Sequence, residues 1–232
     1  MKIDRTVISR LAQKFRFEHG LSQNEAVNVK SLLRKLNILT VYRPLSEDAH
    51  GLSLKSPKGF RFILVNSNSS RGRQHFTIAH ELYHLYYDKD PRPHICFKDG
   101  KSRTERIADC FASALLMPEE GVISILTDEE YANKKISIAQ VLRLEQYFSV
   151  SRHTMLLRLK ELDLLSSQQF ESLKAYPVKR SAKEYGYDNG LYESGNENLV
   201  IGDYGEKARL LFEEEKISEG HYLELLNLIQ NG

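Results

Sequence analysis

The chain has 232 residues, 41% of them hydrophobic, which suffices for one large buried core or for a core with a smaller appendage. Its 33 basic and 31 acidic side chains nearly cancel, which excludes the strong positive excess of proteins that bind nucleic acid mainly through phosphates. No apolar run approaches the roughly 18 residues of a membrane span, no secretory signal opens the chain, and two cysteines make no disulfide framework, so we expect a cytoplasmic protein that contacts no membrane.

The first third of the chain predicts two helices followed by a small sheet. Residues 4–18 and 22–36 have helical apolar spacing, and Ser22 with Glu25 resembles the capping box of the second helix. The period then changes, and three short strands separated by turn residues predict an antiparallel sheet: 39–43, 51–55 and 60–66.

The third of these strands directly precedes the next helix. Residues 60–65 therefore suggest a sheet edge that pairs with an extended substrate backbone. An ordinary edge strand covered by the rest of the protein is the alternative.

The next run contains the pattern His-Glu-Leu-Tyr-His at residues 80–84. Apolar residues recur around it at helical spacing, without Gly or Pro. Because His80 and His84 are four residues apart, a helix projects both from one face, where they can share one metal ion, and Glu81 lies beside that face. Two ordinary surface histidines are the alternative interpretation.

Residues 88–103 are rich in proline, glycine and charge, which predicts a loop that spans two metal-bearing helices and gates the cleft between them. Cys96 lies in this loop. One interpretation is that the Cys96 thiolate binds the open coordination position of a catalytic zinc ion and so holds the enzyme inactive. The alternative is an ordinary half-buried thiol. Packing suffices to explain Cys110.

Residues 104–118 predict a second metal-bearing helix, which ends at a proline. A catalytic zinc ion takes three protein ligands, and Glu105 is the best candidate for the third. Asp109, four residues later, is expected to accept the ring N–H of a ligating histidine. A solvated acidic stripe near the start of a helix is the alternative.

The expected cofactor is one Zn²⁺ ion, although Mn²⁺ or Fe²⁺ fits the same three donors. Such an ion activates water and polarises a carbonyl, and Glu81 would serve as the general base. The group that stabilises the oxyanion stays open among five candidates chosen by residue type: Tyr83, Tyr86, Tyr87, His94 and His153.

The remainder of the chain is mostly helical. Residues 119–126, 138–148 and 151–162 predict helices, and a tight turn at 149–151 makes the last two similar to a helix-turn-helix. Its basic residues, Arg152 among them, would suit a DNA groove, but the overall charge balance makes direct DNA binding the weaker alternative to packing on the core or recognising a protein partner.

Beyond this pair, residues 175–202 suggest an extended linker or hairpin, and 203–215 and 218–230 suggest two closing helices. Three regions follow from these patterns. They are a metallopeptidase core at 1–130, a helix-turn-helix-like region at 131–175, and a linker with a helical pair at 176–232.

Two stretches resemble the signature of the ImmA/IrrE family of bacterial metallo-endopeptidases, a gluzincin-like HExxH followed by ExxxD. They are residues 73–85 and residues 105–118, the second with the pattern Glu-x-x-Ala-Asp-x-Phe-Ala. The likeness extends over residues 5–165 and is strongest over 60–118. One departure is Tyr83, where members often have glycine, so its ring is expected to crowd or line the cleft.

The resemblance implies a zinc protease inside the cell that cleaves a helix-turn-helix repressor or antitoxin and thereby changes transcription. By position, His80, His84 and Glu105 match the family's metal ligands and Glu81 its catalytic acid/base. The expected fold is α+β: a mostly helical, zincin-like protease with a small antiparallel three-stranded sheet and a helix-turn-helix-like C-terminal helical region. The rival functions are a catalytically silent zinc-binding interaction protein and a DNA-binding regulator.

Overall fold

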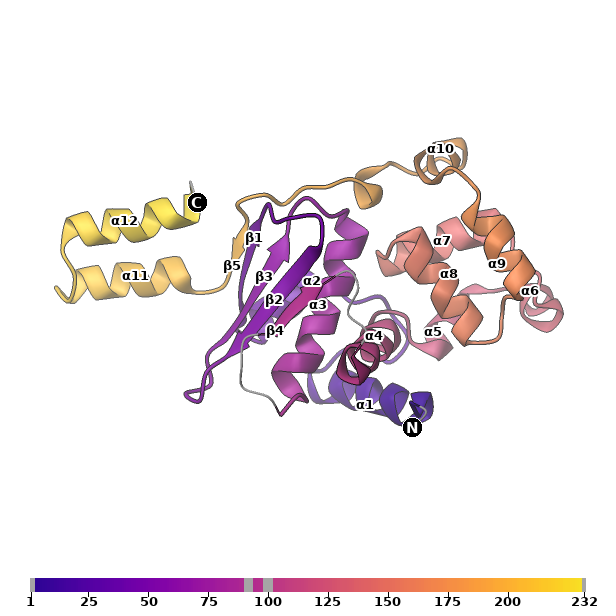
Figure 1. The fold of residues 1–232 in the computed structure, drawn as a ribbon, viewed down its shortest axis with the longest axis horizontal. Coiled ribbons are helices and arrows are strands. Elements are labelled where there is room, and N and C mark those ends of the chain that lie inside the picture. The colour runs from indigo at the N-terminus through magenta and orange to yellow at the C-terminus, as the bar shows by residue number, and fades with distance from the viewer. Residues whose placement is uncertain (1–2, 90–93, 98–101, 231–232) are drawn as a thin grey trace.

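A computed structural model describes residues 3–89, 94–97 and 102–230 (Figure 1). It opens with α1 (Arg5–Glu18), whose first turn is capped by the Asp4 carboxylate, and α2 (Val29–Lys35), capped by Asn28. The second helix starts seven residues later than expected. The buried guanidinium of Arg16 donates hydrogen bonds to the carbonyls of Ser22 and Glu25, so this segment bends around Arg16 instead of forming a helical turn.

The sheet has five strands among the described residues, in the order β4-β2-β3-β1-β5, and it is mixed. Only β1 and β3 pair in parallel; the other three pairs are antiparallel. The expectation of three antiparallel strands is therefore wrong. The strands are β1 (Leu39–Arg43), β2 (Ala49–Lys55), β3 (Arg61–Asn66), β4 (His94–Phe97) and β5 (Val200–Ile201).

Two features of the chain explain this difference. β2 and β3 form a local hairpin, but β1 joins the far side of β3 instead of pairing with its neighbour in sequence. The strands β4 and β5 are four and two residues long, too short for any apolar period to show in the sequence. Because β3 pairs on both sides, the expectation that residues 60–65 form an open edge is also wrong.

The core lies between one face of the sheet and the helices α3 (Arg71–Tyr86) and α4 (Arg103–Leu116), with α1 packed on α4 (Figure 1). Alternate strand residues such as Tyr42 and Ile63 are fully buried, as period-two burial on one sheet face requires. Lys55 of β2 donates hydrogen bonds to the carbonyls of His84 and Asp88, which fixes the C-terminal end of α3 beside the sheet.

Six α-helices lie between α4 and the return of the chain to the sheet, and the pair α7 and α8 has nearly the expected bounds. The tight turn between them places Ser149 in the left-handed region, with φ of 55°. This turn packs on the start of α3 so closely that a Cβ on Gly72 would lie 2.8 Å from the Ser151 nitrogen. The helices are α5 (Glu119–Ile125), α6 (Asp128–Asn133), α7 (Ile138–Phe148), α8 (Arg152–Glu161), α9 (Ser167–Lys174) and α10 (Val178–Glu184).

The last part of the chain returns to the sheet before it leaves the core. A short 3-10 helix, η1 (Gly190–Tyr192), and β5 occupy the region expected to be a linker. The final hairpin of α11 (Tyr204–Glu213) and α12 (Glu219–Gln230) extends beyond the β5 edge, apart from the other helices (Figure 1). None of the helices in the described residues is long and apolar enough to cross a membrane.

Candidate metal centre

Three buried side chains from two helices converge on one point. His80 and His84 extend from the same face of α3, and Glu105 comes from the first turn of α4. The two Nε2 atoms are 3.2 Å apart, and the Glu105 carboxylate oxygens lie 3.3 Å from His80 Nε2 and 3.4 Å from His84 Nε2. All three residues are at most 7% exposed, so the cluster is largely shielded from bulk solvent.

The outward-facing nitrogen of each imidazole contacts a carboxylate. His80 Nδ1 lies 2.9 Å from Asp109, as the sequence predicts, and His84 Nδ1 lies 3.0 Å from Asp88. Each carboxylate accepts a hydrogen bond from the Nδ1–H group, so each Nε2 carries the lone pair and directs it toward Glu105. Sequence reasoning missed Asp88, although its position four residues after His84 was a usable signal.

The donor set fits a metal ion. Two lone-pair nitrogens and a carboxylate at these separations repel one another unless a cation lies between them. Two imidazoles and one carboxylate are the ligands of many catalytic zinc sites, which leave a further position for water or substrate. These three residues would therefore hold the ion that the sequence leads us to expect.

Glu81 is fully buried beside this cluster and is oriented by the sheet. The Ser53 hydroxyl on β2 donates a 2.5 Å hydrogen bond to Glu81 Oε2. Gly51, on the same strand, permits this approach: a Cβ there would lie 2.7 Å from the Thr77 side chain and 2.9 Å from the Leu64 carbonyl. Neither residue was singled out from the sequence, because nothing local to β2 reveals which helix packs on it.

Glu105 owes its position to the start of α4. The Ser102 hydroxyl accepts a hydrogen bond from the Glu105 amide and so caps the helix. Because Glu105 is in the first turn, its carboxylate lies near the positive end of the helix dipole, which favours the ionised form that a metal ligand needs.

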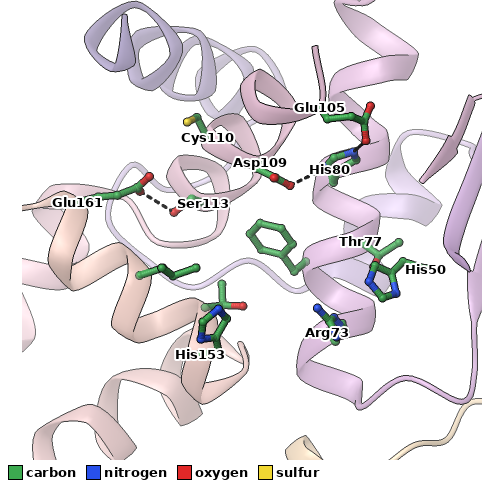
Figure 2. A pocket seen from close by; sticks show the side chains of 13 residues that line it. His50, Arg73, Thr77, His80, Glu105, Asp109, Cys110, Ser113, His153 and Glu161 are labelled. Carbon is green, nitrogen blue, oxygen red and sulfur yellow. Dashed lines mark hydrogen bonds and ion pairs between the residues drawn. The ribbon is translucent and has the colours of Figure 1, made fainter. Parts of the chain in front are cut away.

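A cavity of about 260 Å³ adjoins the metal group and separates α3 and α4 from α8 (Figure 2). His80, Glu105 and Asp109 line one part of it, and His153 lines another. Burial lowers the pKa of His153, and the nearby charges of Lys174 and Arg73 lower it further, so the imidazole is neutral near pH 7.

The three tyrosines proposed for the oxyanion do not line this cavity. Tyr86 and Tyr87 pack edge-on against Phe15 of α1, and the ring of Tyr83 packs against Phe111 and contacts His84. Burial raises the pKa of all three, to about 12 for Tyr87, so they are protonated at neutral pH. Their predicted catalytic role stays a prediction.

Two sequence predictions concern residues that the structure describes only in part. The backbones of His94 and Cys96 belong to β4, but their side chains lie outside the described part, as do residues 90–93 and 98–101 of the expected gating loop. Cys110 lines the cavity beside Asp109, and burial raises the pKa of its thiol.

Comparison with known proteins agrees with this site. A sequence model described as the IrrE N-terminal-like domain, a peptidase domain, matches residues 33–160, more than half of the chain. No curated protein sequence matches. Among solved structures, a Mycobacterium tuberculosis transcriptional regulator is similar, with a TM-score of 0.45 and 19% identity. That match covers 67% of this chain but only 46% of the regulator, so the chain spans less than half of the regulator's length.

Proposed function

This chain belongs to the peptidase family of the IrrE N-terminal-like domain, and from that premise we propose that it is an intracellular zinc-dependent endopeptidase that cleaves a partner protein. The family match agrees with the resemblance seen in the sequence. The observation that carries the proposal is the convergence of His80, His84 and Glu105, with both imidazoles turned by carboxylates so that Nε2 faces inward. A structural metal site would not need a buried glutamate beside it, and Glu81 is one.

The chemistry divides between the ion and the protein. When bound, zinc would polarise the scissile carbonyl and activate a water molecule. Glu81 would accept a proton from that water as the new C–O bond forms, and would return it to the amide nitrogen as the C–N bond breaks. Ser53 would orient Glu81 for this role, because its hydroxyl donates a hydrogen bond to Glu81 Oε2.

The nature of the substrate follows from the family resemblance alone. Relatives of this kind imply a helix-turn-helix repressor or antitoxin as the protein that is cleaved. The output of this chain would then be a change in transcription made by proteolysis.

Direct DNA binding is less well supported, because two of the basic residues of the α7–α8 pair, Arg152 and Arg158, are buried and occupied. Arg152 donates hydrogen bonds of 2.7 and 2.9 Å to Glu145, and Arg158 donates to the Met117 carbonyl and contacts Glu161. Both arginines are at most 6% exposed. Phosphate contacts require accessible cations, so this helix pair suits a packing role better than a groove-reading one.

Co-expression with the protein encoded beside this chain tests the proposal. We expect a truncated partner with the natural chain, and a loss of about 100-fold or more in cleavage rate with Glu81→Gln, because general-base catalysis contributes that much. Zinc content, measured by elemental analysis, should not change. Glu120→Gln, an exposed glutamate on α5, is the matched control and should cleave normally.

Two results would favour the rival functions. If zinc binds stoichiometrically and neither form cleaves any partner, the chain is a catalytically silent zinc-binding protein. If duplex DNA binds tightly with a steep dependence on salt, the chain is a DNA-binding regulator.

A further inference from the structure

The cavity beside the metal group is a groove lined by one stripe from each of three helices. On α3 the stripe includes Arg73, Phe76 and His80. On α4 it includes Glu105 and Asp109, and on α8 it includes His153, Leu157 and Glu161. Figure 2 shows Glu105 and His80 at one part of this groove, and His153 and Arg73 at another. A peptide bound at the metal group would therefore extend its neighbouring side chains along α8.

The groove contains an apolar surface that the protein itself does not cover. Leu157 is 45% exposed, although it lies on a helix whose other leucines, 156 and 159, are fully buried. Phe76 lines the same cavity. Together they offer a contact for one apolar side chain, and the cavity volume of about 260 Å³ is sufficient for such a side chain and part of the next residue.

The charges of the groove are not equivalent. Its acidic groups already interact with the protein: Asp109 with His80 at 2.9 Å, and Glu161 with the Ser113 hydroxyl at 3.2 Å and with Arg158 at 3.4 Å. Arg73 is exposed, and its guanidinium forms no hydrogen bond or ion pair with any residue in the described ranges. The unmatched charge in the groove is therefore positive.

The wall that α8 contributes is held by buried contacts at the start of the helix. Arg152, at the start of the helix, forms a two-bond ion pair with the buried Glu145 of α7 and also donates to the Ser181 hydroxyl at 3.2 Å. The preceding turn packs on Gly72 with no room for a side chain. Because these contacts already order α8, little conformational entropy is lost there when a ligand binds.

We propose that this groove selects the substrate segment beside the scissile bond, with an apolar side chain against Phe76 and Leu157 and an adjacent carboxylate at Arg73. The guanidinium of Arg73 can donate two parallel hydrogen bonds to that carboxylate. This inference rests on the proposed peptidase function and names its preferred substrate, a peptide segment in which an apolar residue is next to Asp or Glu.

Short peptides test the groove without any need for turnover. The probes are acetylated, amidated hexapeptides that carry Leu-Asp or Asp-Leu between glycines, with Leu-Lys, Lys-Leu and Gly-Asp versions for comparison. They are titrated into the full-length, zinc-loaded Glu81→Gln protein, and methyl NMR signals of Leu157 and Thr154 are followed. We expect these signals to shift, with Kd about fivefold lower for the Asp peptides than for the Lys peptides.

Two variants and two matched controls complete the test. Leu157→Ala should weaken binding of the Leu-Asp peptide about fivefold, because it removes a leucine-sized apolar contact. Arg73→Glu should reverse the preference toward Lys. The controls are Leu210→Ala, a leucine of similar exposure on α11, and Arg10→Glu on α1, and both should bind as the parent does. Thermal unfolding verifies that every variant folds.

The outcomes separate this inference from the peptidase proposal. The groove assignment is overturned if the peptides shift no groove signal up to their solubility limit, or if Asp and Lys peptides bind equally and Arg73→Glu changes nothing. Partner cleavage by the natural chain, measured separately, would in that case leave the peptidase function standing. Groove binding without cleavage of any partner would support the groove assignment and contradict the peptidase function.

Discussion

Two carboxylates set the orientation of the metal-binding histidines, and they come from different places. Asp109 reaches His80 from α4, whereas Asp88 reaches His84 from just beyond the end of α3. Asp109 has a half-exposed side chain, while that of Asp88 is 21% exposed. The better-shielded contact acts in a less polar environment, so we expect Asp88 to matter at least as much as Asp109 for metal affinity.

Replacement of Asp88 by alanine tests this expectation. Without the acceptor for Nδ1–H, the His84 ring is free to rotate and to change tautomer, and zinc affinity should fall about 10- to 100-fold. Competition with a chromophoric chelator measures it. Asp48→Ala, an exposed aspartate in the β1–β2 connection, should leave affinity unchanged. Equal affinities for Asp88→Ala and the natural chain would mean that the ring is positioned by packing alone.

The sequence predicted the parts of the site that a motif in the chain marks, and it missed contacts that depend on how separate elements pack. The spacing of His80 and His84 follows from helical geometry, and a third ligand was sought because a catalytic zinc ion takes three, with Glu105 as the best candidate. The hydrogen bond from Ser53 to Glu81 depends on how β2 packs against α3, which no local pattern encodes. Tyr83 was expected to crowd or line the cleft; its ring packs against Phe111 and contacts His84, and its predicted role at the site stays a prediction.

At the scale of elements, the start of α3 is tied to the α7–α8 turn, and this tie fixes the distance between the metal helices and α8. His75 is central to it, because its Nδ1 donates a 2.8 Å hydrogen bond to the Ser149 carbonyl. Burial lowers the pKa of His75; the Ser149 carbonyl raises it in part, and the charge of Lys30 lowers it further.

This shift makes the stability of the folded chain sensitive to acid. The folded-state pKa of His75 lies below its unfolded value of about 6.5, so the unfolded chain takes up the proton first as pH falls. The stabilisation is complete well above pH 6.5 and is lost as the pH drops below it. In urea unfolding at several pH values, His75→Gln should therefore show a smaller fall in the free energy of unfolding between pH 7 and pH 5.

A control separates His75 from the protein's other histidines. His221 is exposed on α12, so His221→Gln should keep the pH dependence of the natural chain. If His75→Gln has the same pH slope as His221→Gln, the protonation of His75 does not account for the loss of stability in acid.

Long helices were predicted with greater success than strand partners. The bounds of α7 were exact to the residue, because eleven residues with a strong apolar period leave little choice. Strand order depends on which segments meet in space, so the parallel pairing of β1 with β3 was not predictable from period alone. The three-region division at 1–130, 131–175 and 176–232 stays a prediction.

Across the whole molecule, residues 188–201 run from α10 back to the metal-bearing core and bind it. The Tyr192 hydroxyl donates a 2.6 Å hydrogen bond to the buried Glu145, and the Asn196 amide donates a 2.7 Å hydrogen bond to Gln74 of α3. Gln74 in turn donates to the carbonyls of Ser67 and Gly195. The segment then pairs with β1 as β5. Residues 188–201 thus form a strap that contacts the sheet, α3 and α7.

The α11–α12 hairpin behaves differently, and two truncations distinguish it from the strap. Its helices pack chiefly on each other, and several large apolar side chains, Leu210 and Leu223 among them, are exposed. A chain that ends after Asp203 lacks only this hairpin, so it should keep its zinc content and unfold within a few degrees of the natural chain.

A chain that ends at Tyr187 also loses the strap and several partly buried hydrogen bonds, each worth about 1 kcal/mol. It should therefore unfold some 10 °C lower or more, as a domain of this size responds to losses of several kcal/mol. Calorimetry of the two truncations measures the difference, and equal midpoints would show that the strap adds nothing to the stability of the core.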